Sequence, residues 1–104
     1  MFMYRSISKM NINDGVKAFR QNKNAVLLDV RTKEEYAERH IDGSINLPLQ
    51  VIESIPSLID DKYTTLYVYC RSGARSAQAV TILKRLGYSN AIDIGGILSY
   101  KEEY

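Results

Sequence analysis

The chain has 104 residues, a length that fits a single domain spanning residues 1–104. Hydrophobic residues make up 45% of the chain and charged residues 25%, ordinary values for a globular domain that argue against disorder and against a membrane protein. The net charge of +2 arises from basic and acidic residues interspersed along the chain, so it does not favour nucleic acid as a partner.

The cysteine and histidine content restricts the possible sites further. With one cysteine and one histidine, the chain has neither a disulfide framework nor the usual ligands of a zinc site, and we expect no metal and no cofactor. The N-terminus has no signal-peptide character, and no apolar stretch is long enough to span a bilayer. We therefore expect a cytoplasmic protein without a membrane partner, an environment that suits a lone thiol.

The first half of the chain alternates strand and helix signals. A weak strand is expected at Arg5–Met10, followed by a helix capped by Asn11. The nearly continuous apolar run Ala25–Val30 is typical of a strand covered on both faces. Thr32 and Glu35 then form a capping box, which predicts a short helix.

The second half continues the alternation. A helix over Val51–Ile59 should be broken at Pro56, and the clearest helix of the chain is predicted at Ser76–Leu86. A short terminal helix should follow the Gly-Gly pair at 95–96. Further strands are expected at Ser44–Leu47, Thr65–Tyr69 and Asn90–Ile94. The alternation predicts an α/β fold, with a five-stranded, mainly parallel sheet flanked by helices on both faces.

The segment after the fourth predicted strand has the clearest chemical potential. Ligands of such sheets bind outside the carboxyl ends of the strands, which is where Cys70 stands. A helix N-terminus and a glycine-containing turn both present backbone N–H groups to anions, and two arginines add charge suited to oxyanions. The candidate catalytic residue is Cys70, and the candidate substrate-binding residues are Arg71, Ser72, Gly73, Ala74, Arg75 and Ser76.

Cys70 has two interpretations. A free cysteine in a domain of this kind is usually an inert, buried, small hydrophobic side chain. Here, however, two arginines, a glycine turn and a helix start follow within six residues, and together they favour a reactive thiol. We expect these groups to outweigh burial at the strand end, so that Cys70 is a thiolate at neutral pH.

The ordered motifs of this chain resemble those of the single-domain rhodaneses, which are thiosulfate or persulfide sulfurtransferases. The resemblance runs from about residue 7 to residue 100, and its motifs are Leu28–Arg31, Glu34–Tyr36, Arg39–Asn46, Tyr69–Ser76 and Ile94–Ile97. It implies that Cys70 carries a persulfide surrounded by the backbone amides of residues 71–76. One departure is Tyr100, at a position where relatives commonly carry tryptophan.

The resemblance implies that Cys70 attacks the outer sulfur of thiosulfate or another persulfide donor and passes that sulfur to a thiophilic acceptor, either a small thiol or a partner protein. Cysteine-dependent phosphatases are a competing class, but their Cys-to-Arg loop is longer than the one from Cys70 to Arg75. A shorter ring of amides suits a single sulfur better than a phosphate. A non-catalytic docking module and a persulfide carrier fed by another enzyme are further alternatives, and the carrier needs the same loop as the enzyme.

The remaining polar residues of these motifs have supporting roles. Asp29 and Arg31 lie at the sheet edge of Cys70, where they either support the loop and its positive potential or form a structural ion pair. Arg75 is expected to be the fixed bidentate partner of an oxyanion, whereas Arg71 either faces the anion or points outward towards solvent, where it would serve to dock an acidic partner. The motif that contains His40, the only histidine, implies a structural role for it rather than that of a catalytic base.

Overall fold

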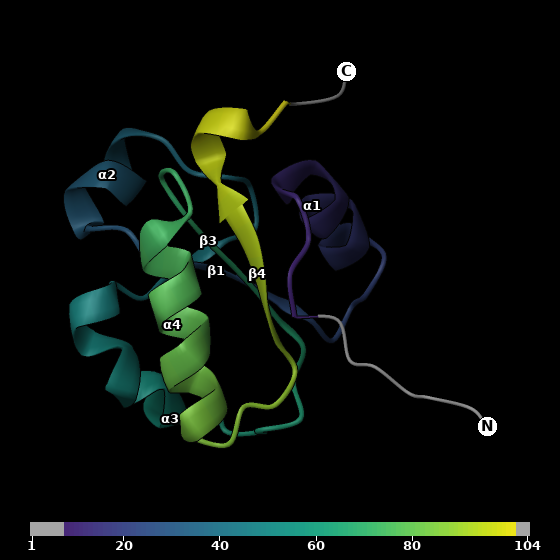
Figure 1. Ribbon diagram of the computed structural model, residues 1–104, viewed down its shortest axis with the longest axis vertical. Helices are drawn as coiled ribbons and strands as arrows, with labels where there is room; N and C mark the ends of the chain where they lie inside the picture. The colour runs from purple at the N-terminus through teal and green to yellow at the C-terminus, as the bar shows by residue number, and fades with distance from the viewer. Residues whose placement is uncertain (1–7, 102–104) are drawn as a thin grey trace.

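The computed structural model describes residues 8–101 and is built around one parallel sheet (Figure 1). The strands are β1 (Val26–Asp29), β2 (Ile45–Asn46), β3 (Leu66–Cys70) and β4 (Ala91–Gly96), and their order across the sheet is β2-β1-β3-β4. All three neighbouring pairs are parallel, so the carboxyl ends of the strands lie at one edge. The predicted α/β class with a parallel sheet is confirmed.

Across the described residues 8–101 the sheet has four strands, so the prediction of five was wrong. Residues 5–7 of the expected first strand lie outside the described residues. In the described part, Lys9 forms only an isolated parallel bridge with Asp93. Two backbone hydrogen bonds hold this segment against β4, from Met10 N to Asp93 O and from Asp93 N to Ser8 O, at 2.8 and 2.9 Å. The chain then enters the cap of the first helix at Asn11, so the described residues 8–10 contribute this bridge and no strand.

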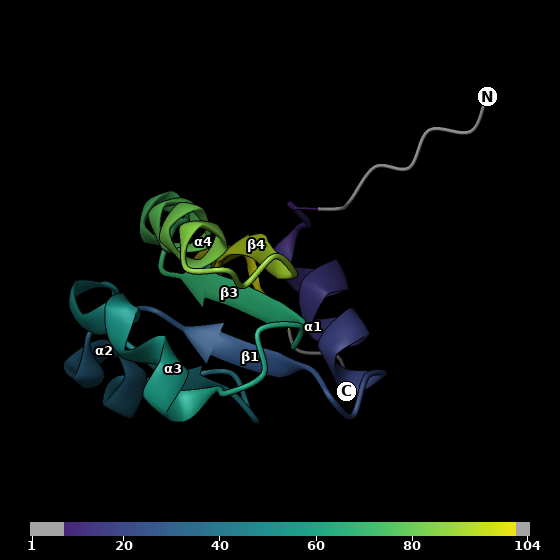
Figure 2. The same cartoon turned by 90° about the horizontal axis from the view of Figure 1, so that it is seen from below.

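Helices cover both faces of the sheet, as predicted (Figures 1 and 2). One face carries α4 (Ala74–Arg85), α3 (Ile55–Leu58) and the 3-10 helix η1 (Leu49–Ser54), and the other carries α1 (Ile12–Arg20) and the 3-10 helix η2 (Ile97–Ser99). The short helix α2 (Lys33–Glu38) follows β1. None of the helices within residues 8–101 is long and apolar enough to cross a membrane.

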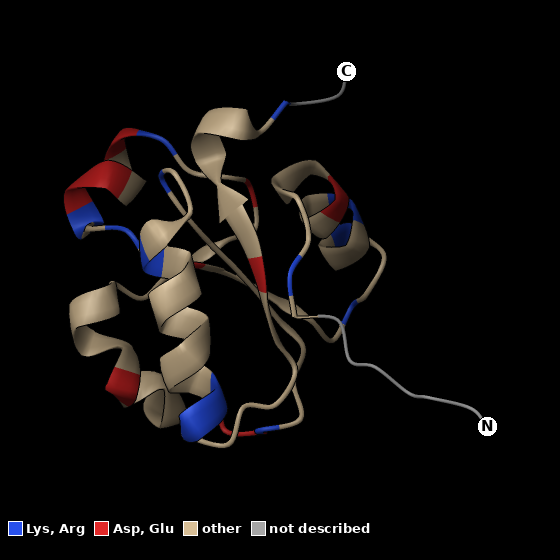
Figure 3. Ribbon diagram, viewed as in Figure 1, with Lys and Arg blue, Asp and Glu red and all other residues tan. Residues whose placement is uncertain are grey.

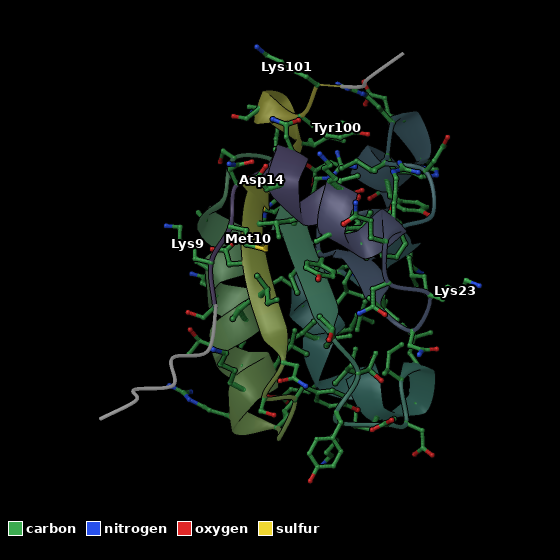
Figure 4. All side chains as sticks on the ribbon, turned by 90° about the vertical axis from the view of Figure 1, so that its right-hand side faces the viewer. Lys9, Met10, Asp14, Lys23, Tyr100 and Lys101 are labelled. Carbon is green, nitrogen blue, oxygen red and sulfur yellow. The ribbon has the colours of Figure 1, made fainter. Side chains whose placement is uncertain are left out.

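Two hydrophobic cores form because side chains alternate along each strand. On β3, Val68 and Cys70 face the core beneath α4, whereas Tyr67 and Tyr69 face the core beneath α1. Figure 4 shows the α1 side, and the partly buried Tyr100 packs against this second core. The alternation therefore points the sulfur of Cys70 towards α4.

The helix boundaries follow local signals. The side chain of Asn11 accepts a hydrogen bond from Asp14 N at 2.9 Å, and the capping box of Thr32 and Glu35 is formed in both directions. The helix expected over residues 51–59 is divided into η1 and α3. Pro56 lies in the first turn of α3, where its missing N–H costs nothing.

A buried hydroxyl network attaches the turn at residues 41–44 to the sheet. The hydroxyl of Tyr69 accepts a hydrogen bond from Ile41 N at 3.1 Å and lies 3.0 Å from the hydroxyl of Ser44. Ser44 Oγ in turn donates to Ile41 O at 2.7 Å. Burial raises the pKa of Tyr69 to about 12, so the phenol stays protonated. The network therefore fixes the segment that leads from α2 into β2.

We predict that Tyr69→Phe lowers the free energy of unfolding by about 1–3 kcal/mol, because the buried N–H of Ile41 loses its acceptor. Tyr67→Phe is the matched control: Tyr67 packs in the same core, and no hydrogen bond of its hydroxyl is recorded among the described residues. The control should change stability by less than about 0.5 kcal/mol. Chemical unfolding of both variants tests this, and equal losses would contradict it.

Candidate active site at the carboxyl end of β3

Cys70 is followed by a turn of three residues, Arg71 to Gly73, that leads directly into α4. Gly73 is the N-cap residue and has a φ of +115°, a left-handed conformation that residues with a side chain rarely adopt. The helix begins at Ala74, two residues before the predicted start at Ser76. The difference arises because Gly73 caps the helix without the side-chain signal on which sequence prediction depends.

The end of β4 lies directly against this turn. A Cβ atom at Gly96 would collide with the carbonyl oxygen of Arg71 and would lie 2.6 Å from Cα of Ser72. The same carbonyl accepts a hydrogen bond from Leu98 N at 3.2 Å. Glycine is therefore required at position 96 for β4 and η2 to hold the turn in place.

The sulfur of Cys70 sits inside the turn, and only 1% of the residue is exposed. Gly73 N donates a hydrogen bond to Cys70 Sγ at 3.0 Å. The first turn of α4 has no side-chain cap, so its N–H groups are available to an anion, and the helix dipole adds partial positive charge. The arrangement is a backbone cradle with a thiol at its base.

Ser76 and Asp93 lie on the α4 and β4 sides of the same sulfur, and both are buried. Ser76 Oγ is 3.5 Å from Cys70 Sγ and donates to Asp93 Oδ1 at 2.7 Å. Asp93 Oδ1 also accepts the N–H of Gly95 at 2.9 Å. The carboxylate thus connects the β4 end of the site to the start of α4.

Arg75 points towards α2. Its Nη1 and Nη2 donate to the two carboxylate oxygens of Glu35 at 2.7 and 3.0 Å. The hydrogen bond from Arg75 lowers the pKa of Glu35 to about 2 against the opposing effect of burial, and the N–H of Thr32 also lowers it. The guanidinium of Arg75, which the sequence predicted to bind an oxyanion, is therefore bound to a carboxylate of the protein itself.

Arg71 is exposed and lies beside a pocket of about 200 Å³. The pocket opens between α2, the segment after it, the Cys70 turn and η2. Its lining residues are Arg31, Glu35, Glu38, Arg39, Arg71, Ile97 and Leu98. In Figure 3 the basic turn after β3 lies close to the acidic helix α2. Positive side chains on the turn and on the segment around α2 therefore border one entrance.

Asp29 and Arg31 form one of the two arrangements considered from sequence, a buried ion pair. Arg31 Nη2 donates to Asp29 Oδ2 at 2.7 Å and to the carbonyl oxygen of Arg39 at 2.6 Å. Burial opposes the charge of Arg31, but the hydrogen bonds with Asp29 raise its pKa. The recorded contacts of His40 are with Tyr36, on whose ring it stacks at 3.8 Å.

Sequence reasoning missed Asp93 and the partner of Arg75. Asp93 interrupts an otherwise apolar strand, and a buried charge of that kind always needs a partner, so a signal was present. Glu35 was recognised only as part of a capping box. Its contact with Arg75 bridges 40 residues and has no local signature.

The family model of the rhodanese-like domain matches residues 13–103. The chain therefore belongs to the rhodanese-like domain family. The ordered motifs had pointed to this family, and the cradle between β3 and α4 lies within the matched region.

Individual relatives of known sequence or structure are consistent with this family. Thiosulfate sulfurtransferase PspE of Escherichia coli is 42% identical over 71 residues, which cover 67% of this chain and 68% of PspE. Adenylyltransferase and sulfurtransferase uba4 of Ogataea parapolymorpha is 42% identical over 78 residues, or 74% of this chain but only 20% of uba4. The solved structure of a rhodanese with anions from E. coli has a TM-score of 0.70 at 36% identity, covering 76% of this chain and 94% of that one. These relatives support sulfurtransferase activity.

We predict that Glu35→Gln lowers the free energy of unfolding by up to about 1 kcal/mol at pH 7, a limit set by solvent screening of this partly exposed pair. The folded pKa of Glu35, about 2, lies below the ordinary value of 4.5, so the contribution is complete above about pH 5 and is lost as the pH falls towards 2. The difference between the two proteins should shrink over that interval.

The control is Glu34→Gln, which removes the same charge from the first turn of α2 without touching Arg75. Its effect on stability should be smaller. A Glu35→Gln difference that stays constant from pH 6 to pH 2.5 would contradict the assignment of the ion pair.

Proposed function

We propose that this protein transfers sulfane sulfur from thiosulfate, or from another persulfide donor, to a thiophilic acceptor through a persulfide on Cys70. The observation that carries the proposal is the N–H of Gly73 directed at Cys70 Sγ, in a glycine-shaped turn at the start of α4. Because only 1% of Cys70 is exposed, a donor must approach the thiol with its terminal sulfur first.

The reaction has two displacement steps. The thiolate of Cys70 attacks the outer sulfur of thiosulfate, a new S–S bond forms at Cys70, and sulfite leaves with the electron pair of the broken S–S bond. A thiolate or cyanide acceptor then attacks the outer sulfur of the persulfide, and Cys70 leaves as the thiolate. Such a ping-pong scheme is typical of covalent catalysis and needs no cofactor.

The cradle supports the persulfide because the outer sulfur carries negative charge. The N–H of Gly73 is directed at Cys70 Sγ, and the start of α4 adds uncapped N–H groups and the positive end of the helix dipole. We assign the contacts with the transferred sulfur to the backbone of residues 71–76. In this proposal Ser72 and Ala74 contribute through their N–H groups rather than through their side chains.

We assign the recognition of the donor anion to Arg71 rather than to Arg75. The guanidinium of Arg75 already binds both carboxylate oxygens of Glu35, so its role is to position the start of α4. Arg71 is exposed at the pocket, where Arg31 adds positive potential although it is paired with Asp29. A sulfonate-like oxyanion that enters the pocket therefore meets Arg71 first.

A second candidate is a persulfide carrier that receives its sulfur from another enzyme. It is favoured by the match to a fifth of uba4, which is named both adenylyltransferase and sulfurtransferase. A carrier would load poorly from thiosulfate but readily from a protein persulfide. The initial rate of loading with thiosulfate compared with that from a persulfidated donor protein separates the two roles.

We predict that intact protein treated with thiosulfate gains the mass of one sulfur atom and that cyanide removes it. Cys70→Ser should gain no sulfur, because the nucleophile is lost. Mass spectrometry of both proteins gives the answer. Sulfur transfer by folded Cys70→Ser would refute the scheme.

We predict that Arg71→Ala raises the KM for thiosulfate about tenfold, the loss that corresponds to one good charge-assisted contact. Arg71→Lys should recover part of the loss, since the charge is kept but not the planar fork. Arg85→Ala, at the far end of α4, is the charge-matched control. Steady-state kinetics test this prediction. An unchanged KM for Arg71→Ala would contradict the role of Arg71 and would mean that the backbone alone binds the anion.

A further inference from the structure

The hydroxyl of Ser76 has one proton and too many acceptors for it. Besides Cys70 Sγ at 3.5 Å, the neighbours of Ser76 Oγ are Asp93 Oδ1 at 2.7 Å, Gly73 O at 3.0 Å and Gly95 O at 3.4 Å. All three oxygens are acceptors only. The hydroxyl can therefore donate its proton to one of these oxygens or to the sulfur. The acceptor that takes the proton decides whether Ser76 presents a proton or a lone pair to Cys70 Sγ.

Asp93 is the strongest of these acceptors. Its contact with Ser76 is the shortest, a bond from a hydroxyl to a carboxylate is roughly twice as strong as a neutral one, and both residues are buried. The N–H of Gly95 fixes the same carboxylate oxygen in place. With its proton given to Asp93, Ser76 presents only lone pairs to Cys70, which suits a thiol donating S–H and disfavours a thiolate.

We propose that Asp93 is a positioning residue that acts through Ser76 to favour the thiol of Cys70 over its thiolate and so to raise the pH at which the nucleophilic thiolate appears. The proposal rests on the sulfurtransferase function for its significance. A thiolate that is harder to form is a poorer leaving group, so the Asp93–Ser76 pair slows the discharge of sulfur from a loaded Cys70. The pair therefore opposes the Gly73 N–H, which stabilises negative charge on the same sulfur.

Other charged groups surround this sulfur, and most of them are paired. Arg75 of α4 is bound to Glu35 of α2, and Asp29 and Arg31 of β1 are bound to each other. Arg71 is exposed on the turn, and Lys9 lies in the segment beside β4, at the edge of the sheet visible in Figure 4. Asp93 differs from the paired acids because its recorded partners are neutral: Ser76 and the N–H of Gly95.

The test is the pH dependence of alkylation by iodoacetamide. Cys70 is the only cysteine of the chain, so the reaction reports on this residue alone. Asp93→Asn should move the midpoint to lower pH by about 0.5 to 1 unit, because a neutral amide oxygen accepts from the Ser76 hydroxyl more weakly than a carboxylate does and competes less with the sulfur for its proton. Ser76→Ala should also move it to lower pH, because the thiol loses its acceptor. If Ser76 instead donates to a thiolate, Ser76→Ala moves the midpoint to higher pH.

Two controls separate the hydrogen-bond route from charge alone. Asp42→Asn removes one exposed carboxylate and should leave the midpoint within about 0.2 unit. In a Ser76→Ala background, Asp93→Asn should add less than half of its effect in the native background. Thermal unfolding establishes that each variant is folded, and if Asp93→Asn is not, the sign of the Ser76→Ala shift decides.

An unchanged or higher midpoint in folded Ser76→Ala or Asp93→Asn would overturn the proposal. Alkylation requires no sulfur donor, so its result is independent of the sulfurtransferase assignment. A protein that fails to take up sulfur but shows the predicted shifts would refute the proposed function and keep the role of Asp93.

Discussion

The site depends on one geometric constraint, the connection of β3 to α4 by only three residues. So short a turn brings the N–H of Gly73 onto Cys70 Sγ, but it also requires a left-handed residue at position 73 and free space beneath Arg71. Gly73 meets the first requirement and Gly96 the second. Two glycines far apart in the chain are thus parts of one structural unit, and both shape the cradle.

The charged residues around the cradle show how the protein distributes its electrostatic potential. Asp29 pairs with the buried Arg31, which therefore does not cost the energy of an isolated buried charge, and Glu35 pairs with the partly exposed Arg75. Arg71 remains exposed for an incoming anion. Beneath the sulfur, Asp93 acts in the opposite sense through Ser76. The reactivity of Cys70 then reflects a balance between the amides that stabilise charge and the carboxylate that opposes it.

Much of the fold could be predicted from sequence because its signals are local. The cap at Asn11, the capping box of Thr32 and Glu35, and the apolar run that becomes β1 all lie within a few neighbouring residues. The expected fifth strand does not form over the described residues 8–10, because they make only a single bridge to β4 before the chain enters α1.

The location of the site was also predictable, since a cysteine, a glycine turn and a helix start lie together in the sequence. The internal partners were not. The contact between Arg75 and Glu35 joins residues that only the fold brings together, so the expected anion contact and the observed ion pair could not be told apart beforehand. Asp93 was detectable as a charge in a buried strand, but its connection to Ser76 depends on how β4 lies against α4.

The central claim is that the backbone cradle holds a transferred sulfur on Cys70. A crystal structure of the thiosulfate-treated protein tests it most directly, with anomalous scattering used to locate sulfur. The account predicts one additional sulfur bonded to Cys70 Sγ, within hydrogen-bond distance of the N–H groups of residues 71–76. A sulfur that is absent from Cys70, or bonded there but directed away from these amides, would contradict the account.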